Sequence, residues 1–126
     1  MKKRIIREEV IKLIYQDILG GDFFAEDIAS EIIENYNEIK DKYQELDEII
    51  SSNLVNWTID RLNYVDLAII RFATYEMLYV KTPPQVAINE ALEITKIYSN
   101  LDDDLAKKFN NRVLENIKNF LEKKNG

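Results

Sequence analysis

The stretch that decides the fold runs from Val65 to Val80 and reads VDLAIIRFATYEMLYV. On a helix its apolar residues point to several sides, with Val65, Ile69, Phe72 and Tyr79 on one and Leu67, Ile70, Met77 and Leu78 on others. A helix that is apolar most of the way round is usually a central, buried helix. The sequence Thr82-Pro83-Pro84 then ends it, because proline interrupts helical hydrogen bonding and pushes the residue before it out of helical geometry. The stretch therefore predicts a buried central helix.

The segments on either side of this stretch show the apolar spacing of amphipathic helices. The predicted apolar faces are Ile6, Val10, Leu13, Ile14 and Ile18; Phe24, Ile28, Ile32 and Tyr36; Leu46, Ile49, Ile50, Leu54 and Trp57; Ala87, Ala91, Ile94 and Tyr98; and Leu105, Phe109, Val113, Ile117 and Leu121. We expect Gly20-Gly21 to end the first helix, Asp22 to cap the second, and the charged segment near 37–45 to form a loop.

No segment shows the alternation of a strand, so the fold class is all-α. We expect a compact bundle of six to seven helices in two packed sub-bundles. A length of 126 residues fits one domain. We therefore expect a single domain over 1–126, with an N-terminal helical half of about 1–60 and a C-terminal helical half of about 61–126.

The composition excludes most enzyme classes. The chain has no Cys and no His, and its three glycines cannot build a phosphate-binding glycine-rich loop. Hydrolysis by paired carboxylates and binding of a hard cation remain formally open. Asp102-Asp103-Asp104 is a candidate for such a cation site, but three acids before a helix more often cap it. We expect no enzymatic activity, no cofactor and no metal.

The net charge of −6 is distributed unevenly. Residues 1–15 carry a net charge of +3, residues 16–60 carry −10, and residues 61–126 carry +1. A local basic patch can contact phosphate while the acidic remainder repels nucleic acid elsewhere. No stretch approaches the roughly 20 apolar residues of a membrane span, and the N-terminus lacks the apolar core of a signal peptide. We expect a cytoplasmic protein that does not bind membranes.

Four blocks of the chain, in order, resemble the NusB family of transcription antitermination factors. The blocks are Arg7-Glu8 with Leu13-Ile14-Tyr15; the segment from Arg61 to Leu78; the segment Pro84-Gln-Val-Ala-Ile-Asn-Glu-Ala-Leu-Glu-Ile-Thr-Lys96; and Lys108-Phe109-Asn110-Asn111-Arg112-Val113-Leu114. The last block is similar to the family's K-F-V-N-G-V-L, although Asn110-Asn111-Arg112 stands where the family has V-N-G.

This resemblance implies a bacterial RNA-binding protein that pairs with NusE, a small-subunit ribosomal protein. Together the two would bind single-stranded boxA RNA of nascent transcripts, notably of ribosomal RNA operons, within the RNA polymerase antitermination complex. The sequence leaves open whether the free protein is a monomer or a homodimer. Two alternatives also remain open: a protein–protein scaffold of the same fold without RNA binding, and an accessory domain related to that of RNA methyltransferases.

The candidate site residues divide between RNA and protein. The RNA-binding candidates are Lys2, Lys3, Arg4, Arg7, Lys107, Lys108 and Phe109. The cations would contact phosphates and Phe109 would stack on a base. The alternative to RNA contact is that the N-terminal lysines and arginines form a solvated, positively charged end of the helix, and that Phe109 is a core residue. The resemblance places Tyr15 and Glu76 near the NusE-facing surface, although Tyr15 could equally be a half-buried core residue.

Two further charged residues, Arg71 and Glu90, lie in or near apolar stretches. An unpaired buried charge is costly. We expect each of them to have an oppositely charged partner within the fold.

Overall fold

The structure is a computed structural model that describes residues 2–23, 25–99 and 104–125. Within these ranges six α-helices follow one another without strands, which confirms the all-α fold class. They are α1 (Lys3–Ile18), α2 (Ser30–Lys40), α3 (Tyr43–Ser52), α4 (Tyr64–Tyr75), α5 (Pro84–Tyr98) and α6 (Leu105–Asn125). Three short helical turns complete the fold: η1 (Ala25–Asp27), η2 (Ile59–Arg61) and the π-helical turn η3 (Glu76–Val80).

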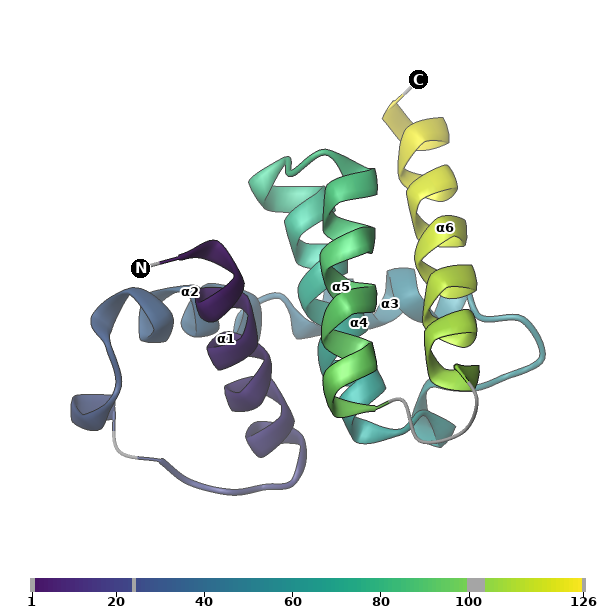
Figure 1. Cartoon of the computed structure of the whole chain (residues 1–126). Helices are drawn as coiled ribbons and strands as arrows, with labels where there is room; N and C mark the ends of the chain where they lie inside the picture. Colours follow the sequence, from purple (N-terminus) through teal and green to yellow (C-terminus); the bar gives the residue numbers. More distant parts are fainter. Residues whose placement is uncertain (1, 24, 100–103, 126) are drawn as a thin grey trace.

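The predicted central helix is confirmed as α4, continued by η3. Residues 66–70 and 72–77 are all buried. Helix α4 packs against α1, α3, α5 and α6, so it has neighbours on every side. Asn63 starts it by accepting a hydrogen bond from the backbone N–H of Val65 at 2.8 Å. Figure 1 shows α1 and α2 on one side of the α4–α5 pair and α6 on the other.

Helix α1 also follows its sequence pattern. Val10, Leu13 and Ile14 are buried, while Ile6 and Ile18 pack half-buried against the core. The helix ends at Ile18, and Gly20 directly afterwards has a φ of +77°. Glycine reaches this left-handed conformation without the steric cost that a Cβ atom imposes. The predicted role of the Gly20-Gly21 pair is confirmed.

The predictions between Asp22 and Trp57 need correction. Asp22 does not cap α2, which begins eight residues later at Ser30 after the turn η1; Phe24 lies outside the described residues. The charged segment 37–45 is mostly helical, because α2 and α3 continue to within two residues of each other. Helix α3 ends at Ser52, so Trp57 lies in the following connection and not on a helical face.

The apolar faces of α5 and α6 are confirmed except at their ends. Ala87, Ala91 and Ile94 are buried on α5, and Val113, Ile117 and Leu121 are buried on α6. Tyr98 at the end of α5 and Leu105 at the start of α6 are exposed. These two ends flank residues 100–103, which include Asp102 and Asp103 and lie outside the described residues.

Candidate nucleic-acid interface

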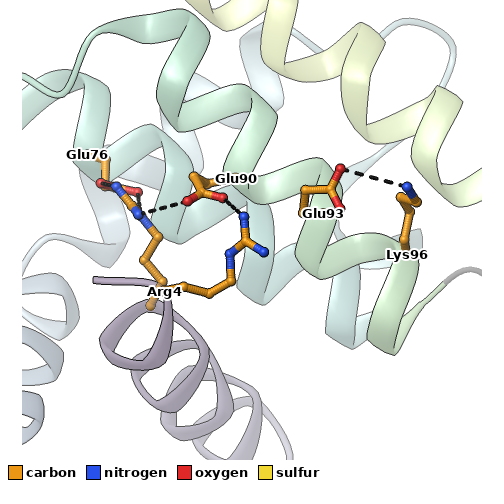
Figure 2. A network of polar contacts seen from close by, with 6 residues as sticks. Arg4, Glu76, Glu90, Glu93 and Lys96 are labelled. Atoms are coloured by element: carbon orange, nitrogen blue, oxygen red, sulfur yellow. Dashed lines mark hydrogen bonds and ion pairs between the residues drawn. The ribbon is translucent and has the colours of Figure 1, made fainter. Parts of the chain in front are cut away.

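The start of α1 carries the predicted N-terminal cations. Lys2, Lys3 and Arg4 are exposed there, and no ion pair of Lys2 or Lys3 occurs within the described ranges. Arg4 is paired with Glu90 of α5, and Figure 2 shows its guanidinium reaching across to that carboxylate. The hydrogen bond to Glu90 raises the pKa of Arg4 above its ordinary value. Arg4 therefore presents a charge to solvent that an acid of the same molecule already contacts.

Arg7 lies one helical turn further along and is buried. It donates from Nε to Glu76 Oε1 at 2.8 Å and from Nη2 to Glu76 Oε2 at 2.9 Å. A third bond from Nη1 reaches Glu90 Oε1 at 3.4 Å. The hydrogen bonds that Arg7 donates to Glu76 raise the pKa of the guanidinium. Arg7 and Arg4 do share one helix face, but this face packs on η3 and α5, so the expectation that Arg7 is an open phosphate ligand is corrected.

Glu76 is the buried partner in this network. Only 7% of its side chain is exposed, and it also accepts a hydrogen bond from Thr82 Oγ1 at 3.0 Å. A bidentate arginine–carboxylate pair combines the strongest hydrogen bonds available to side chains with fixed geometry. In this structure Glu76 joins η3 to α1, and its place near the NusE-facing surface stays a prediction.

Tyr15 is half-buried on α1 and lines a groove with a volume of about 420 Å³. The other lining residues are Leu62, Asn63, Tyr64, Val65, Tyr98 and Ser99. The groove lies where the end of α1 meets the start of α4 and the end of α5. Lys12 lies beside it, with its Nζ 5.7 Å from the centre of the Tyr98 ring. This position leaves Tyr15 accessible to a partner.

The start of α6 brings together the second group of predicted residues. Lys108 is exposed, while Lys107 and Phe109 are half-buried. The Phe109 ring packs against the core and meets Trp57 in an edge-on contact with ring centres 6.2 Å apart. Phe109 is therefore partly a core residue, and its stacking on a base stays a prediction for the part of the ring that is accessible.

A buried polar cluster lies beneath the start of α6. Asp66 accepts hydrogen bonds from Ser99 Oγ at 2.5 Å and from Asn110 Nδ2 at 3.1 Å, and this amide also contacts Thr95 Oγ1 at 3.1 Å. Burial raises the pKa of the Asp66 carboxyl, and the two hydrogen bonds oppose that shift. The cluster joins α4, α5 and α6 at the end of the bundle where α6 begins.

The expected partners of Arg71 and Glu90 are both present. Arg71 pairs with Asp47 of α3 through two hydrogen bonds of 2.8 and 2.7 Å and stacks over Tyr43 at 4.2 Å. Glu90 receives Arg4 and Arg7. Both charges are therefore satisfied inside the fold, as predicted.

Three residues near the interface were missed from the sequence. Trp57 was assigned to an apolar helix face, Arg61 was given no role, and Arg112 was noted only as a departure from a family pattern. Asn53 and Asn56 before Trp57 were the available signal, since asparagine is common in turns. Asn56 indeed has a left-handed φ of 59°.

Neither a cluster of metal-binding side chains nor a membrane-spanning helix occurs in the described part of the chain. There, no group of three or more acidic side chains is placed to hold a metal ion. Asp104 is the described member of the acidic triplet, and its backbone oxygen accepts the N–H of Lys108 at 2.9 Å. None of the helices in these ranges is long and apolar enough to cross a membrane.

Comparison with known proteins gives a consistent result. The sequence matches the NusB family over residues 4–119. A curated protein of Bacillus pumilus (strain SAFR-032), named Transcription antitermination protein NusB, is 38% identical over 138 residues, covering 96% of this chain and 98% of the relative.

Two solved structures share the fold. T. maritima NusB superposes with a TM-score of 0.79 at 28% identity, covering 94% of this chain and 92% of that chain. A chain in a structure described as "Crystal Structure of a Plectonemic RNA Supercoil" superposes with a TM-score of 0.82, covering 95% of this chain and 96% of that chain. At 24% identity this second likeness shows the fold alone.

Proposed function

This chain belongs to the NusB family, and from that premise we propose that it binds boxA-type single-stranded RNA together with the ribosomal protein NusE. Its curated relatives are transcription antitermination proteins. The proposed setting is the RNA polymerase antitermination complex on nascent transcripts, notably of ribosomal RNA operons, in the cytoplasm. The proposed unit is the whole chain acting as a single non-enzymatic domain, as a monomer or a homodimer.

The observation that carries the proposal is the exposed cationic start of α1. Lys2, Lys3 and Arg4 are exposed, and they belong to residues 1–15, which carry a net charge of +3 against −10 for residues 16–60 and +1 for residues 61–126. Exposed Lys and Arg are the side chains that contact phosphates and position a nucleic acid. Arg7 is not part of this set, because its guanidinium is buried on Glu76.

The partner surface is proposed at the groove beside Tyr15. Its exposed tyrosines, Tyr64 and Tyr98, offer flat apolar area with polar tips. Aromatic residues of this kind are enriched at protein–protein interfaces. NusE would add its own cations to a protein whose net charge is −6, and so strengthen RNA binding.

The experiment is a titration of a labelled boxA-type RNA with the full chain, alone and with saturating NusE, beside a scrambled RNA of equal length. We expect modest RNA affinity for the chain alone and tighter binding in the presence of NusE. By thermodynamic reciprocity, RNA must then tighten the NusE complex by the same factor. Equal RNA affinity with and without NusE would contradict joint binding.

The same titration separates the alternatives. A scaffold of the NusB fold without RNA binding would bind NusE with unchanged affinity whether RNA is present or not. A methyltransferase-type accessory domain would act beside a catalytic domain, because the three glycines of these 126 residues cannot form a glycine-rich cofactor loop. Neither alternative predicts a preference for boxA over scrambled RNA.

A further inference from the structure

The connection between α3 and α4 carries an exposed aromatic residue against the start of α6. Trp57 is 42% exposed, and it follows Asn56, which has a left-handed φ of 59°. The connection is held to α6 by a hydrogen bond from Asn116 Nδ2 to the backbone oxygen of Asn53 at 3.3 Å. In Figure 1 this connection passes beside the lower half of α6.

Two side chains fix the Trp57 indole from different directions. The Arg61 guanidinium carbon lies 4.5 Å from the centre of the indole ring, within the range of a cation–π contact. The Phe109 ring meets the indole edge-on at 6.2 Å with an angle of 64°. These contacts orient the indole while leaving much of it open to solvent.

A single exposed aromatic residue needs no explanation by itself. Here, however, the Arg61 guanidinium stacks on it, and its ring partner Phe109 lies on the first turns of α6, which carry cations with no acidic partner within the described ranges. Lys108 and Arg112 are exposed one turn apart on the same face of α6, and neither forms an ion pair there. The Arg61 guanidinium stacks on Trp57 and forms no ion pair with any residue that the structure describes.

The local charge favours a polyanion. Residues 53–63 and 104–112 together contain four bases, Arg61, Lys107, Lys108 and Arg112, against two acids, Asp60 and Asp104. Their balance of +2 contrasts with −6 for the whole chain. An oriented aromatic ring, a stacked guanidinium and neighbouring free cations are the features that bind single strands by stacking on bases and contacting phosphates.

We propose that Trp57 and Arg61 form a stacking platform for one unpaired base of the RNA, with Arg112 and Lys108 contacting the phosphates beside it. The platform rests on the proposed function, because it takes the same RNA that the start of α1 contacts. It extends the interface from Phe109 to the α3–α4 connection. The occupant is a base of single-stranded RNA and not a duplex, since paired bases do not expose a free face for stacking.

The chain offers a direct readout, because Trp57 is its one tryptophan. Saturating boxA-type RNA, titrated in the presence of NusE, should change the tryptophan fluorescence of the chain after correction for any signal from NusE. An abasic ribose-phosphate oligomer of the same length should leave it unchanged, since it supplies phosphates without bases. The affinity itself is measured separately by anisotropy of the labelled RNA.

Substitutions test the same platform without fluorescence. Trp57→Ala should weaken RNA binding roughly 5- to 100-fold, the loss expected for one stacked base, and Trp57→Phe should lose less. Arg112→Ala should flatten the slope of log affinity against log salt by about 0.7. Val55→Ala is the matched control, because Val55 is 56% exposed on the same connection and forms no stacking contact among the described residues.

The outcomes separate this inference from the proposed function. Unchanged fluorescence, together with wild-type affinity in folded Trp57→Phe and Arg112→Ala, would overturn the platform while RNA binding stands. Absence of RNA binding by the wild-type complex would overturn both. Quenching by boxA RNA but not by the abasic oligomer, with selective weakening in the Trp57 variants, would support the platform.

Discussion

The cations at the start of α1 and those at the start of α6 differ in what they contact within the fold. At α1, Arg4 is paired with Glu90, and Arg7 is buried between Glu76 and Glu90. At α6, the side chains of Lys108 and Arg112 form no ion pair in the part of the chain that the structure describes. A phosphate that approaches Arg4 would therefore compete with the Glu90 carboxylate. A phosphate that approaches Lys108 or Arg112 would meet no such competitor among the described residues.

This difference distinguishes cations that stabilise the fold from cations that are free to contact a ligand. Removing a buried, paired arginine leaves an uncompensated carboxylate inside the protein, so the fold is weakened. Removing an exposed, unpaired cation changes stability little and acts on the ligand. Unfolding is therefore the measurement for Arg7, and RNA affinity is the measurement for the cations that are exposed and unpaired among the described residues, Lys2, Lys3, Lys108 and Arg112.

The largest expected effect is on folding. Arg7→Ala should lower the free energy of unfolding by about 3–5 kcal/mol, because it leaves Glu76 buried without its bidentate partner. Urea denaturation followed by circular dichroism measures it. Arg4→Ala is the matched control, one turn away on the same face but exposed, and should unfold close to the wild-type midpoint. Equal free energies of unfolding for the two variants would contradict a structural role for Arg7 that Arg4 lacks.

A smaller effect is expected on RNA affinity. Glu90→Gln removes the carboxylate that competes for Arg4, while Arg7 keeps its two hydrogen bonds to Glu76. RNA should then bind up to about fivefold more tightly, in keeping with the small strength of an exposed ion pair. Anisotropy of labelled RNA at low salt measures the gain.

The control for this gain lies one turn along α5. Glu93→Gln removes the same charge, but Glu93 pairs with Lys96 at 3.7 Å and not with Arg4, as Figure 2 shows. A gain in Glu93→Gln as large as in Glu90→Gln would mean that general repulsion is responsible. Release of Arg4 would then not be the cause.

Periodic features of the fold were predictable from the sequence. The spacing of Val10, Leu13 and Ile14 predicted the buried face of α1, and the apolar run from Val65 predicted a helix buried on all sides. Both predictions rest on the spacing of apolar residues a few positions apart, and this spacing can be seen in the sequence. The need of Arg71 for an acidic partner was also predictable, because an unpaired charge there would be costly.

What failed depends on residues far apart in the sequence. Arg7 and Glu76 are 69 positions apart, so nothing local revealed that they form one buried pair. Arg7 was predicted to contact phosphate as part of the basic N-terminus, and Glu76 was placed near the NusE-facing surface by the family resemblance. The helical state of most of 37–45 was missed for a different, local reason: its many charged residues suggested a loop, although Ile39 among them is buried on α2.

The candidate site was predictable only in part. Lys2, Lys3, Arg4 and Lys108 are exposed as expected, since short-range sequence favours a solvated basic end. The position of Trp57 beside Phe109 was not predictable, because it depends on where α3 ends and on how the following connection crosses α6.

The most direct test of the account is the salt dependence of RNA binding by the Lys2→Ala/Lys3→Ala variant. Two phosphate contacts on a single strand contribute about −1.4 to the slope of log affinity against log salt, so the variant's slope should be flatter by that amount. Affinity should fall by a similar factor for boxA and scrambled RNA, because phosphate contacts position without specifying. Lys123→Ala/Lys124→Ala, which makes the same charge change at the exposed end of α6, should keep the wild-type slope. An unchanged slope in a Lys2→Ala/Lys3→Ala variant that still binds RNA would contradict the placement of RNA at the start of α1.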